Sequence, residues 1–502
     1  MGHLFVAQGD LTKLACDAVL IPCDARLNVS RAWSNILPTG LPAGDAGWLR
    51  LPGDVSNTGV VRLDDHDGRR VCAFVAVEGR ATPDDVVRRM WAAIDHVAQG
   101  LEAGDGRMRP LIGVPLPGTG EGGLSGRRGE VIDRLLDRYR KVAPSSDVAL
   151  ILFDQRDFAA AQNRRDPHRD WSELSDELTS EADRLGELGR HGQLSLFLGA
   201  GVSSPAGLPD WTALLQRLAD EAGLPHAAEG TAPEDAATVI SAQLGDRYHG
   251  LLADLLDVPR HAVGHALLAG LRVQKMVTTN FDPCLEAALD SVLAHEYRVL
   301  ARELADGSLP WLLKLNGDIK VPESVVLTRK DFVQHEAESQ ALRGVVQGLL
   351  LTSHLLFVGY SLREQSFLAL ASEVTQVRQR ARHNGGSRAG TAVALMDSAV
   401  ADFGYQDLHS VSMGASSFGE GAHRLEIFLD RLCWKAASSD ERAAQYLLDD
   451  DYRSGLRANE QVLRDAVYEF LDTVDPAAKT SPGWSRIAET LRGMGAMVES
   501  GP

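Results

Sequence analysis

The sequence predicts an α/β protein in which a doubly wound, mostly parallel sheet follows a first α/β unit. Three observations predict this fold class. Short apolar runs alternate with longer segments of helical spacing, as in strands joined by crossover helices. Several runs are apolar at every position, as in parallel strands buried on both faces. One such run passes directly into a glycine-rich turn before a helix, which is typical of Rossmann-type sheets.

The first domain is predicted to span residues 1–165 and to hold a mostly parallel sheet. Its apolar runs and helical segments follow one another in the order that such a sheet requires. The expected strands are Leu4–Ala7, Ala18–Pro22, Val71–Val77, Arg109–Val114 and Val148–Phe153, and the expected helices are Asp84–Leu101 and Arg128–Arg140.

A highly charged stretch at residues 166–184 is predicted to be a linker, with a helical segment, Glu173–Leu188, leading into the next domain. The second domain is predicted at 185–437 and a helical C-terminal segment at 438–502. A turn is expected at Asn384–Ser387. The expected strands of the second domain are Leu194–Leu198, Met276–Thr278, Trp311–Leu315, Leu355–Val358 and Ala392–Leu395.

The composition disfavours several classes of protein. A formal net charge of -18 argues against direct binding to nucleic acid. The cysteines stand far apart with no CxxC pair, so neither a zinc ribbon nor a disulfide framework is indicated. The sequence shows no signal peptide, and no apolar run approaches the ~20 residues of a membrane span. We therefore expect a cytoplasmic protein that needs no membrane and no metal.

Four motifs each stand directly after an apolar run of the second domain. They are Gly199–Ser203 (GAGVS), Thr278–Asp282 (TTNFD), Lys314–Asp318 (KLNGD) and Gly359–Arg363 (GYSLR). Any one of them has an ordinary structural explanation, because turns rich in Gly, Asn and Asp commonly end strands. Four in succession favour a shared site, since the carboxyl ends of parallel strands line the ligand crevice of a doubly wound sheet.

In their wording and order, these motifs resemble those of the sirtuin-like NADase domain found in bacterial anti-phage defence proteins. The resemblance covers about half of the chain and implies that NAD is the substrate. It assigns Asn280 and Asp282 to the nicotinamide ribose and the attacking water, and position 316 to catalysis. The residues that it implies for binding the dinucleotide are Gly199, Ala200, Gly201, Val202, Pro209, Asp210, Thr279, Gly359 and Ser361.

The sequence departs from the family pattern at Asn316, where the family carries its catalytic histidine. Asparagine forms hydrogen bonds but cannot act as a base near neutral pH. Two explanations are open: an inactivating replacement of the histidine in this chain, or a natural binder without catalysis. The first is favoured, because every other motif residue is intact.

No other histidine can be assigned to the pocket from the sequence. His261 and His265 stand at helical i, i+4 spacing, and without a third ligand this pair favours a packing or surface role over a metal site. The four-cysteine zinc module of deacylase sirtuins is absent, which makes protein deacylation the weaker interpretation.

The first domain contains two segments similar to those of macro domains, which bind ADP-ribose. Gly9–Thr12 with Cys16–Asp24 resembles the opening of that family, and Pro117–Leu124 resembles its second diphosphate loop. The resemblance implies that Asp10 meets the adenine amino group, that Leu11 belongs to the same ligand site, and that Asp24 lies where hydrolytic macro domains place an asparagine. It also implies that the diphosphate contacts Gly118, Thr119, Gly120 and Gly122. A sensor is favoured over a hydrolase, and a purely structural α/β domain remains the alternative.

Together these features predict an NAD hydrolase that acts in anti-phage defence by NAD depletion and releases nicotinamide with ADP-ribose or a cyclic product. An ADP-ribose-type nucleotide at the first domain is expected to regulate it, and a homo-oligomer is expected. The alternatives are a non-catalytic NAD or ADP-ribose binder, and a protein ADP-ribosyltransferase or deacylase.

Overall fold

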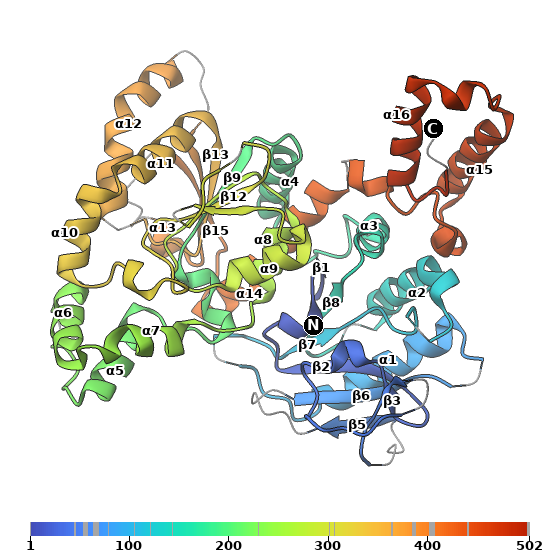
Figure 1. Cartoon of the computed structure of the whole chain (residues 1–502), viewed down its shortest axis with the longest axis horizontal. Coiled ribbons are helices and arrows are strands. Elements are labelled where there is room, and N and C mark those ends of the chain that lie inside the picture. The colour runs from blue at the N-terminus through green and yellow to red at the C-terminus, as the bar shows by residue number, and fades with distance from the viewer. Residues whose placement is uncertain are drawn as a thin grey trace.

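The computed structural model of the chain shows two α/β units side by side, with a helical C-terminal segment beside the first (Figure 1). It describes residues 2–44, 47–53, 59–63, 70–78, 80–104, 106–120, 122–142, 144–228, 230–300, 302–305, 307–362, 365–383, 388–400, 407–438 and 441–498. The predicted turn at Asn384–Ser387, Glu121 of the diphosphate-like loop and Arg363 of the fourth motif lie outside these residues.

The first unit is built on a six-stranded sheet in the order β1-β8-β7-β2-β6-β5. All neighbours pair in parallel except the edge strand β5, which is antiparallel to β6. The strands are β1 (Leu4–Gln8), β2 (Ala18–Asp24), β5 (Val60–Leu63), β6 (Arg70–Val77), β7 (Leu111–Val114) and β8 (Asp147–Leu152), with a small hairpin of β3 (Asn28–Val29) and β4 (Leu49–Arg50). The helices are α1 (Pro83–Ala98), α2 (Arg128–Lys141) and α3 (Gln155–Arg164).

The second unit holds a parallel seven-stranded sheet in the order β11-β12-β10-β9-β13-β14-β15. Its strands are β9 (Leu194–Leu198), β10 (Lys275–Thr278), β11 (Arg298–Leu300), β12 (Trp311–Lys314), β13 (His354–Val358), β14 (Gly390–Ala394) and β15 (Leu408–Ser412). Its longer helices are α4 (Asp176–Arg190), α5 (Trp211–Ala222), α6 (Pro233–Leu244), α7 (Arg247–Leu256), α8 (Val263–Gly270), α9 (Cys284–Leu293), α10 (Arg329–Glu338), α11 (Gln340–Thr352), α12 (Gln365–His383) and α14 (Phe418–Ala437).

Helices cover both faces of this sheet because its central strands are apolar on both sides. Along β9, Leu196 and Leu198 pack into the core that α4, α8, α9 and α14 share, whereas Phe197 packs into the core under α11 and α12. Alternate residues of a strand point to opposite faces, so a run of apolar residues needs two covers. The predicted doubly wound α/β class is confirmed.

A buried charged cluster joins the two units. Asp430 of α14 is fully buried and accepts hydrogen bonds from His3 Nε2 (2.9 Å), Arg165 Nη2 (2.7 Å) and Trp171 Nε1 (2.7 Å). Burial alone would raise the pKa of Asp430, but the nearby Arg165 and His3 lower it to about 2. Removing one partner of such a buried pair typically costs about 3–5 kcal/mol. Within residues 166–184, which were predicted as a linker from their charge, Trp171 is buried in this cluster.

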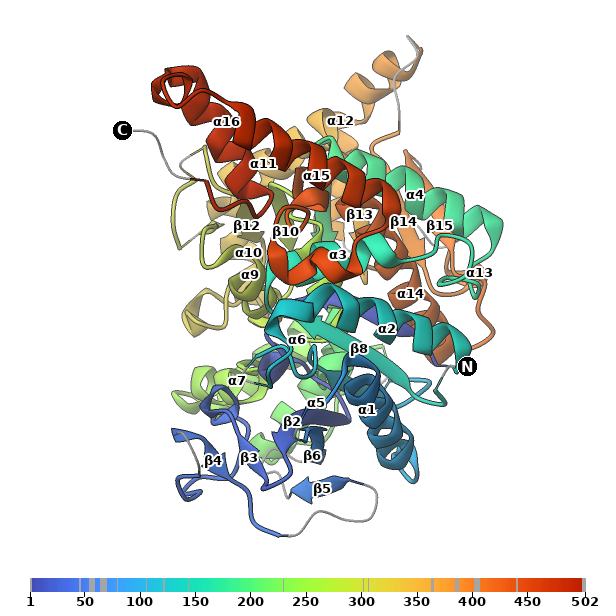
Figure 2. The ribbon, with the colours of Figure 1, turned by 90° about the vertical axis from the view of Figure 1, so that its right-hand side faces the viewer.

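The C-terminal segment is helical and packs on the first unit, as Figure 2 also shows. It contains a 3₁₀ turn at Asp450–Gly455, α15 (Ala458–Thr473) and α16 (Pro482–Gly493). Tyr452 Oη donates to Asp157 Oδ1 at 2.7 Å, and Arg164 Nη1 pairs with Glu460 Oε2 at 3.0 Å. These two contacts fix the segment against α3, and its 3₁₀ turn also packs on α2.

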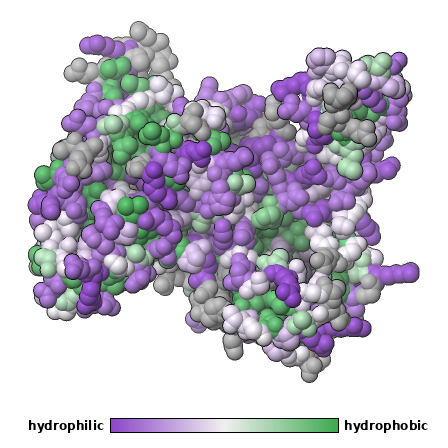
Figure 3. All heavy atoms as spheres, in the orientation of Figure 1, coloured by the Kyte–Doolittle hydropathy of each residue, from purple (hydrophilic) through white to green (hydrophobic). Residues whose placement is uncertain are grey.

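The face of the molecule seen in Figure 3 is largely hydrophilic, in keeping with the high charge of the chain. Among the described residues, no helix is both long enough and apolar enough to cross a bilayer.

Candidate functional site

The four motifs begin at one edge of the second sheet. In the strand register, Lys314 pairs with Thr278, Thr278 with Leu198, and Leu198 with Val358. These residues end β12, β10, β9 and β13, which are neighbours in the sheet. The four turns that follow therefore lie in a row at the carboxyl edge, where doubly wound sheets bind their ligands.

The turns after β9 and β13 touch through their glycines. Gly201 N donates to Gly359 O at 3.0 Å, and a Cβ added to Gly199 would lie 2.5 Å from that same oxygen. Gly359 has a φ of +65°, and its own added Cβ would lie 2.6 Å from Val202 N. Only glycine allows so close an approach and this backbone conformation. The sequence places glycine at all three positions.

A cavity of about 290 Å³, called here the β13 cavity, opens beside these glycines. Of the predicted residues, Gly201, Val202, Gly359 and Ser361 line it. Gly106 of the first unit and Glu426 of α14 also line it, and Arg107 of the first unit holds Glu426 through two hydrogen bonds of 2.8 and 2.9 Å. The first unit thus contributes directly to this cavity.

Asn280 lies in the turn after β10 with its side-chain amide oriented by two hydrogen bonds. Its Nδ2 donates to Gly199 O at 3.2 Å and to Ser203 Oγ at 3.0 Å. Its Oδ1 is buried and has no hydrogen-bond partner in the structure. A buried carbonyl oxygen without a donor is costly, so a group that supplies an O–H or N–H there is favoured.

Behind Ser203 stands His265, which is 1% exposed and lies at the start of α8. Its Nδ1 accepts a hydrogen bond from Ala262 N at 3.2 Å, and its Nε2 lies 3.3 Å from Ser203 Oγ. Burial lowers the pKa of His265 to about 4, so the ring is neutral near pH 7. Because Nδ1 is an acceptor, the single proton resides on Nε2 and is donated to Ser203.

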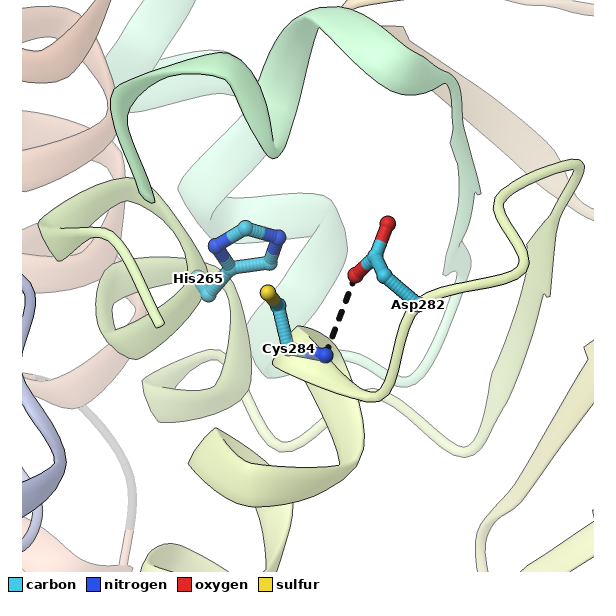
Figure 4. Close-up of side chains that lie close together, drawn as sticks. All are labelled: His265, Asp282 and Cys284. Carbon is cyan, nitrogen blue, oxygen red and sulfur yellow. Dashed lines mark hydrogen bonds between the residues drawn. The ribbon is translucent and has the colours of Figure 1, made fainter. Parts of the chain in front are cut away.

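Asp282, His265 and Cys284 form a compact buried group (Figure 4). Asp282 Oδ1 accepts from Cys284 N at 3.0 Å and so caps the first turn of α9. Cys284 Sγ donates to Arg260 O at 3.3 Å, and burial raises the pKa of this thiol far above its usual range. A metal ion would need the thiolate of Cys284 and a free imidazole nitrogen of His265. Burial keeps the thiol protonated, and both imidazole nitrogens already form hydrogen bonds.

A buried lysine holds the turn that carries Asn280 and Asp282. Lys314, 1% exposed at the end of β12, donates through Nζ to the carbonyl oxygens of Phe281 and Asp282, both at 2.8 Å. The same Nζ pairs with Glu286 at 2.8 Å and with Asp318 at 3.3 Å. Burial raises the pKa of Glu286, and the nearby charge of Lys314 partly offsets this rise. The charge of Lys314 is thus used to fix backbone geometry.

Asn316 follows β12 at the same edge of the sheet as Asn280. Its carbonyl oxygen accepts from Val326 N at 2.9 Å, and its side chain is half-buried. The next residue, Gly317, has a φ of +101°, and an added Cβ would lie 2.1 Å from Ser324 O. A second cavity of about 330 Å³ borders this turn at Lys314, Leu315, Gly317 and Asp318. Neither Asn280 nor Asn316 is among the residues that line the two cavities.

The remaining predicted residues of the second unit shape the backbone. Asp210 is exposed and caps α5, because its Oδ1 accepts from Ala213 N at 2.8 Å. Pro209 precedes it and is half-buried. Thr279 N donates to Leu198 O at 3.1 Å and joins the turns after β9 and β10, whereas Ala200 is exposed beside its two glycines. None of these four lines the β13 cavity.

In the first unit, the predicted ligand residues are largely engaged within their own turns. Asp10 Oδ1 accepts from Thr12 N (2.9 Å) and Thr12 Oγ1 (2.8 Å), and the adjoining Leu11 is buried. Asp24 accepts from the backbone of Arg26 and Asn28, both at 2.8 Å. These hydrogen bonds give Asp10 and Asp24 structural roles.

The diphosphate-like loop depends on two glycines. Gly118 has a φ of +75°, and an added Cβ on Gly122 would lie 2.7 Å from Gly118 O. Gly120 has no such restriction, since nothing lies within 4 Å of an added Cβ. Thr119 is buried, with its Oγ1 donating to Leu116 O at 3.3 Å.

The structure adds residues that the sequence did not single out for this site: His265, Ser203, Lys314 and Glu426. His265 and Ser203 are 62 positions apart, and Arg107 and Glu426 are 319 apart. Of these four residues, only Ser203 and Lys314 could have been found from the sequence, because both stand inside the motifs.

Comparison with known proteins shows which proteins the second unit resembles. Residues 274–402 match the model of the SIR2-like domain. The chain is 28% identical to "NAD(+) hydrolase ThsA" of Enterococcus faecium over 205 residues, which are 39% of this chain and 42% of that protein. It is 26% identical to the protein of the same name from Bacillus cereus (37% and 40%) and 25% identical to "Defense-associated sirtuin 2" of Bacillus subtilis (40% and 21%).

The matched part spans less than half the length of these relatives. The predicted resemblance to sirtuin-like proteins of defence is confirmed for this part. For the first unit, a solved structure named "Oceanobacillus iheyensis macrodomain with ADP" covers 32% of this chain and 88% of its own, at 15% identity and a TM-score of 0.23. The same macrodomain with MES bound covers 32% of this chain and 89% of its own, at 16% identity and a TM-score of 0.24.

Proposed function

We propose that the chain is an NAD hydrolase of bacterial defence, with its site at the carboxyl edge of the second sheet. The single observation that carries the proposal is the buried, unpartnered Oδ1 of Asn280, beside two glycine turns in mutual contact. A ribose hydroxyl supplies the missing donor, and glycine turns admit a pyrophosphate to the backbone. The names of the similar proteins, NAD(+) hydrolase ThsA and Defense-associated sirtuin 2, agree with this chemistry.

In the proposed reaction, the oxygen of a water molecule bonds to C1′ of the nicotinamide ribose while the C1′–N bond breaks. Nicotinamide leaves as the neutral base with the bonding electron pair, and the proton of the attacking water passes to solvent water. Asn280 orients the ribose, Asp282 contributes a carboxylate beside it, and the dinucleotide extends along Gly199–Val202 towards Gly359 and Ser361. Asn316 cannot accept the proton, so we propose that this chain binds NAD but turns it over slowly.

We further propose that a nucleotide of the ADP-ribose type regulates the site from the first unit, within a homo-oligomer. Two contacts support such coupling. Ala15 N donates to His261 O (2.8 Å) and His261 N to Lys13 O (2.9 Å), directly after the turn that Asp10 caps. Glu426 of the β13 cavity is held by Arg107. A signal at the first unit can act only through states that it binds with different affinity.

The test is NAD binding to the full chain by calorimetry. Asn280→Ala removes the oxygen and both orienting hydrogen bonds, and we expect the affinity to fall at least about tenfold, since each lost hydrogen bond costs about 1 kcal/mol or more. Asn459→Ala, an exposed change on α15, is the matched control and leaves the affinity unchanged. Equal affinities for the two variants, or no binding by the parent chain at about 1 mM NAD, would refute the proposal.

A further inference from the structure

The walls of the β13 cavity are mostly apolar. Among the described residues that line it, Glu426 is the single charged side chain. The apolar walls include Val358, Val393, Leu395, Met396 and Leu425. A charged group buried against such walls is unfavourable unless a group of opposite charge pairs with it. The cavity therefore suits an uncharged group, such as a nucleobase with its ribose.

The proposed function brings a dinucleotide past this cavity. Its pyrophosphate lies along the glycine turns after β9 and β13, while Asn280 holds the nicotinamide ribose. Gly201 and Gly359 belong both to those turns and to the lining of the cavity. The nucleoside on the other side of the pyrophosphate is adenosine, so adenosine is the part that enters the β13 cavity.

Glu426 is held in the cavity wall by an arginine of the first unit. It lies on α14, which packs against elements of both units (Figure 1), and it is 7% exposed. Its two carboxylate oxygens accept hydrogen bonds from Nη1 and Nη2 of Arg107, at 2.8 and 2.9 Å. Arg107 Nη2 also lies 3.4 Å from Asp147 Oδ2. The guanidinium of Arg107 is thus engaged by carboxylates, in the paired geometry that arginine and carboxylate favour.

This arrangement distinguishes NAD from NADP, which carries one more phosphate on the 2′-oxygen of the adenosine ribose. Such a phosphate has roughly two negative charges near neutral pH. In the β13 cavity it would lose its hydration among apolar walls and share a small space with the Glu426 carboxylate. Dinucleotide sites that select NAD commonly place a carboxylate at this ribose, whereas an arginine there accommodates the 2′-phosphate. Here Glu426 lines the cavity, and Arg107 is not among its lining residues.

We propose that Glu426 determines which dinucleotide the site accepts, by admitting NAD and excluding NADP. The inference rests on the proposed function, since it names the residue that sets the substrate class of that same site. Because Arg107 belongs to the first unit, both units contribute to this selectivity.

Two substitutions change the charge in the cavity in different ways. Glu426→Gln removes the negative charge with little change of shape, so that Arg107 can attract a phosphate. Ala422→Lys, one turn earlier on α14 and also in the lining, adds a cation and leaves the Glu426–Arg107 pair in place. Asp183→Asn is the matched control. Asp183 forms the same kind of two-bond pair with Arg431 of α14, at 2.7 and 2.8 Å, and is not among the lining residues.

The measurement is the ratio of NAD affinity to NADP affinity, by calorimetry on the full chain. A substitution that only loosens the fold weakens the binding of both ligands, so the ratio isolates the effect of charge. We expect the parent chain to prefer NAD by about 100-fold or more, because like charges placed together are strongly unfavourable. Glu426→Gln and Ala422→Lys should each reduce this preference by about tenfold or more through tighter NADP binding, and Asp183→Asn should leave it unchanged.

A parent chain that binds NADP as tightly as NAD would overturn the proposal and leave the proposed function standing. A preference that Glu426→Gln leaves unchanged would overturn the role of Glu426; if that variant does not fold, an unchanged preference in Ala422→Lys would do so. An equal change of preference in Asp183→Asn would also overturn it, because the effect would then come from the packing of α14. A parent chain that binds neither dinucleotide at about 1 mM refutes the proposed function, and the selectivity with it.

Discussion

The contact between the glycine turns after β9 and β13 gives a sharp test of where the dinucleotide binds. In Gly359→Ala the new Cβ would lie 2.6 Å from Val202 N, about 0.8 Å short of an ordinary contact distance of 3.4 Å. The backbone at φ +65° adds about 1–2 kcal/mol of strain. Both effects push the two turns apart.

A displacement approaching 1 Å can slow a catalysed step by about 100-fold, and we expect the NAD affinity to fall by a similar order. Gly192→Ala is the matched control, because Gly192 has a φ of +66° and nothing within 4 Å of an added Cβ. It should lower the stability of the fold and leave NAD binding intact. The assay is calorimetry on both variants, alongside thermal unfolding. If Gly359→Ala binds NAD as tightly as Gly192→Ala, the dinucleotide does not use this approach and the reasoning is refuted.

Three further predictions concern the fold and the first unit. Burial lowers the pKa of both His261 and His265 from 6.5 to about 4. Between these values the unfolded chain binds more protons than the folded chain, so the free energy of unfolding falls as the pH drops from about 6.5 towards 4. In urea unfolding at a series of pH values, His265→Gln should flatten this pH dependence, and an unchanged slope would contradict the prediction. Ala15→Pro removes the hydrogen bond from Ala15 N to His261 O. This substitution should change the effect that a nucleotide bound to the first unit has on nicotinamide release, and it should leave the NAD affinity measured without that nucleotide unchanged. An unaltered response to the nucleotide would contradict the proposed coupling. Gly118→Val, at φ +75°, should weaken ADP-ribose binding measured by calorimetry more than Gly120→Val does, and the reverse order would place the ligand elsewhere.

The sequence predicted the central strands of the second sheet closely, and the physical reason is burial on both faces. β9 was predicted at Leu194–Leu198, as observed, and β10, β12 and β13 within a residue at each end. Strands at the rim were missed. β11 has only three residues, and β15 reads Leu-His-Ser-Val-Ser with one exposed and two half-buried positions. Edge strands need less apolar surface, so their pattern is weak.

The sequence could predict which turns lie together only where the residues stand directly after a strand. The register of β12, β10, β9 and β13 brings their turns together, which the parallel-sheet rule anticipated. The same rule says nothing about helices that arrive from elsewhere in the chain. His265 was assigned to packing or the surface, and it is indeed buried, but its contact with Ser203 joins separate elements and has no local sequence signal.

The charged stretch at 166–184 contains a contact that the sequence did not predict. Charge within a short window favours exposed chain, and on that ground it predicted a linker. In the structure, Arg165 just before this stretch and Trp171 within it both bind Asp430, which lies about 260 residues further along the chain. Pairing over such a distance depends on the tertiary fold.

The central claim, that this edge of the sheet cleaves NAD, is tested most directly by nicotinamide release from NAD by the full chain with Asn316 and with Asn316→His. A general base typically contributes about 10²–10⁴-fold to such a step. We expect histidine at this position to raise the rate by that order, and Asn280→Ala to abolish the gain. Equal and negligible release with Asn316 and with histidine, by a protein that binds NAD, would contradict the account and leave a non-catalytic binder.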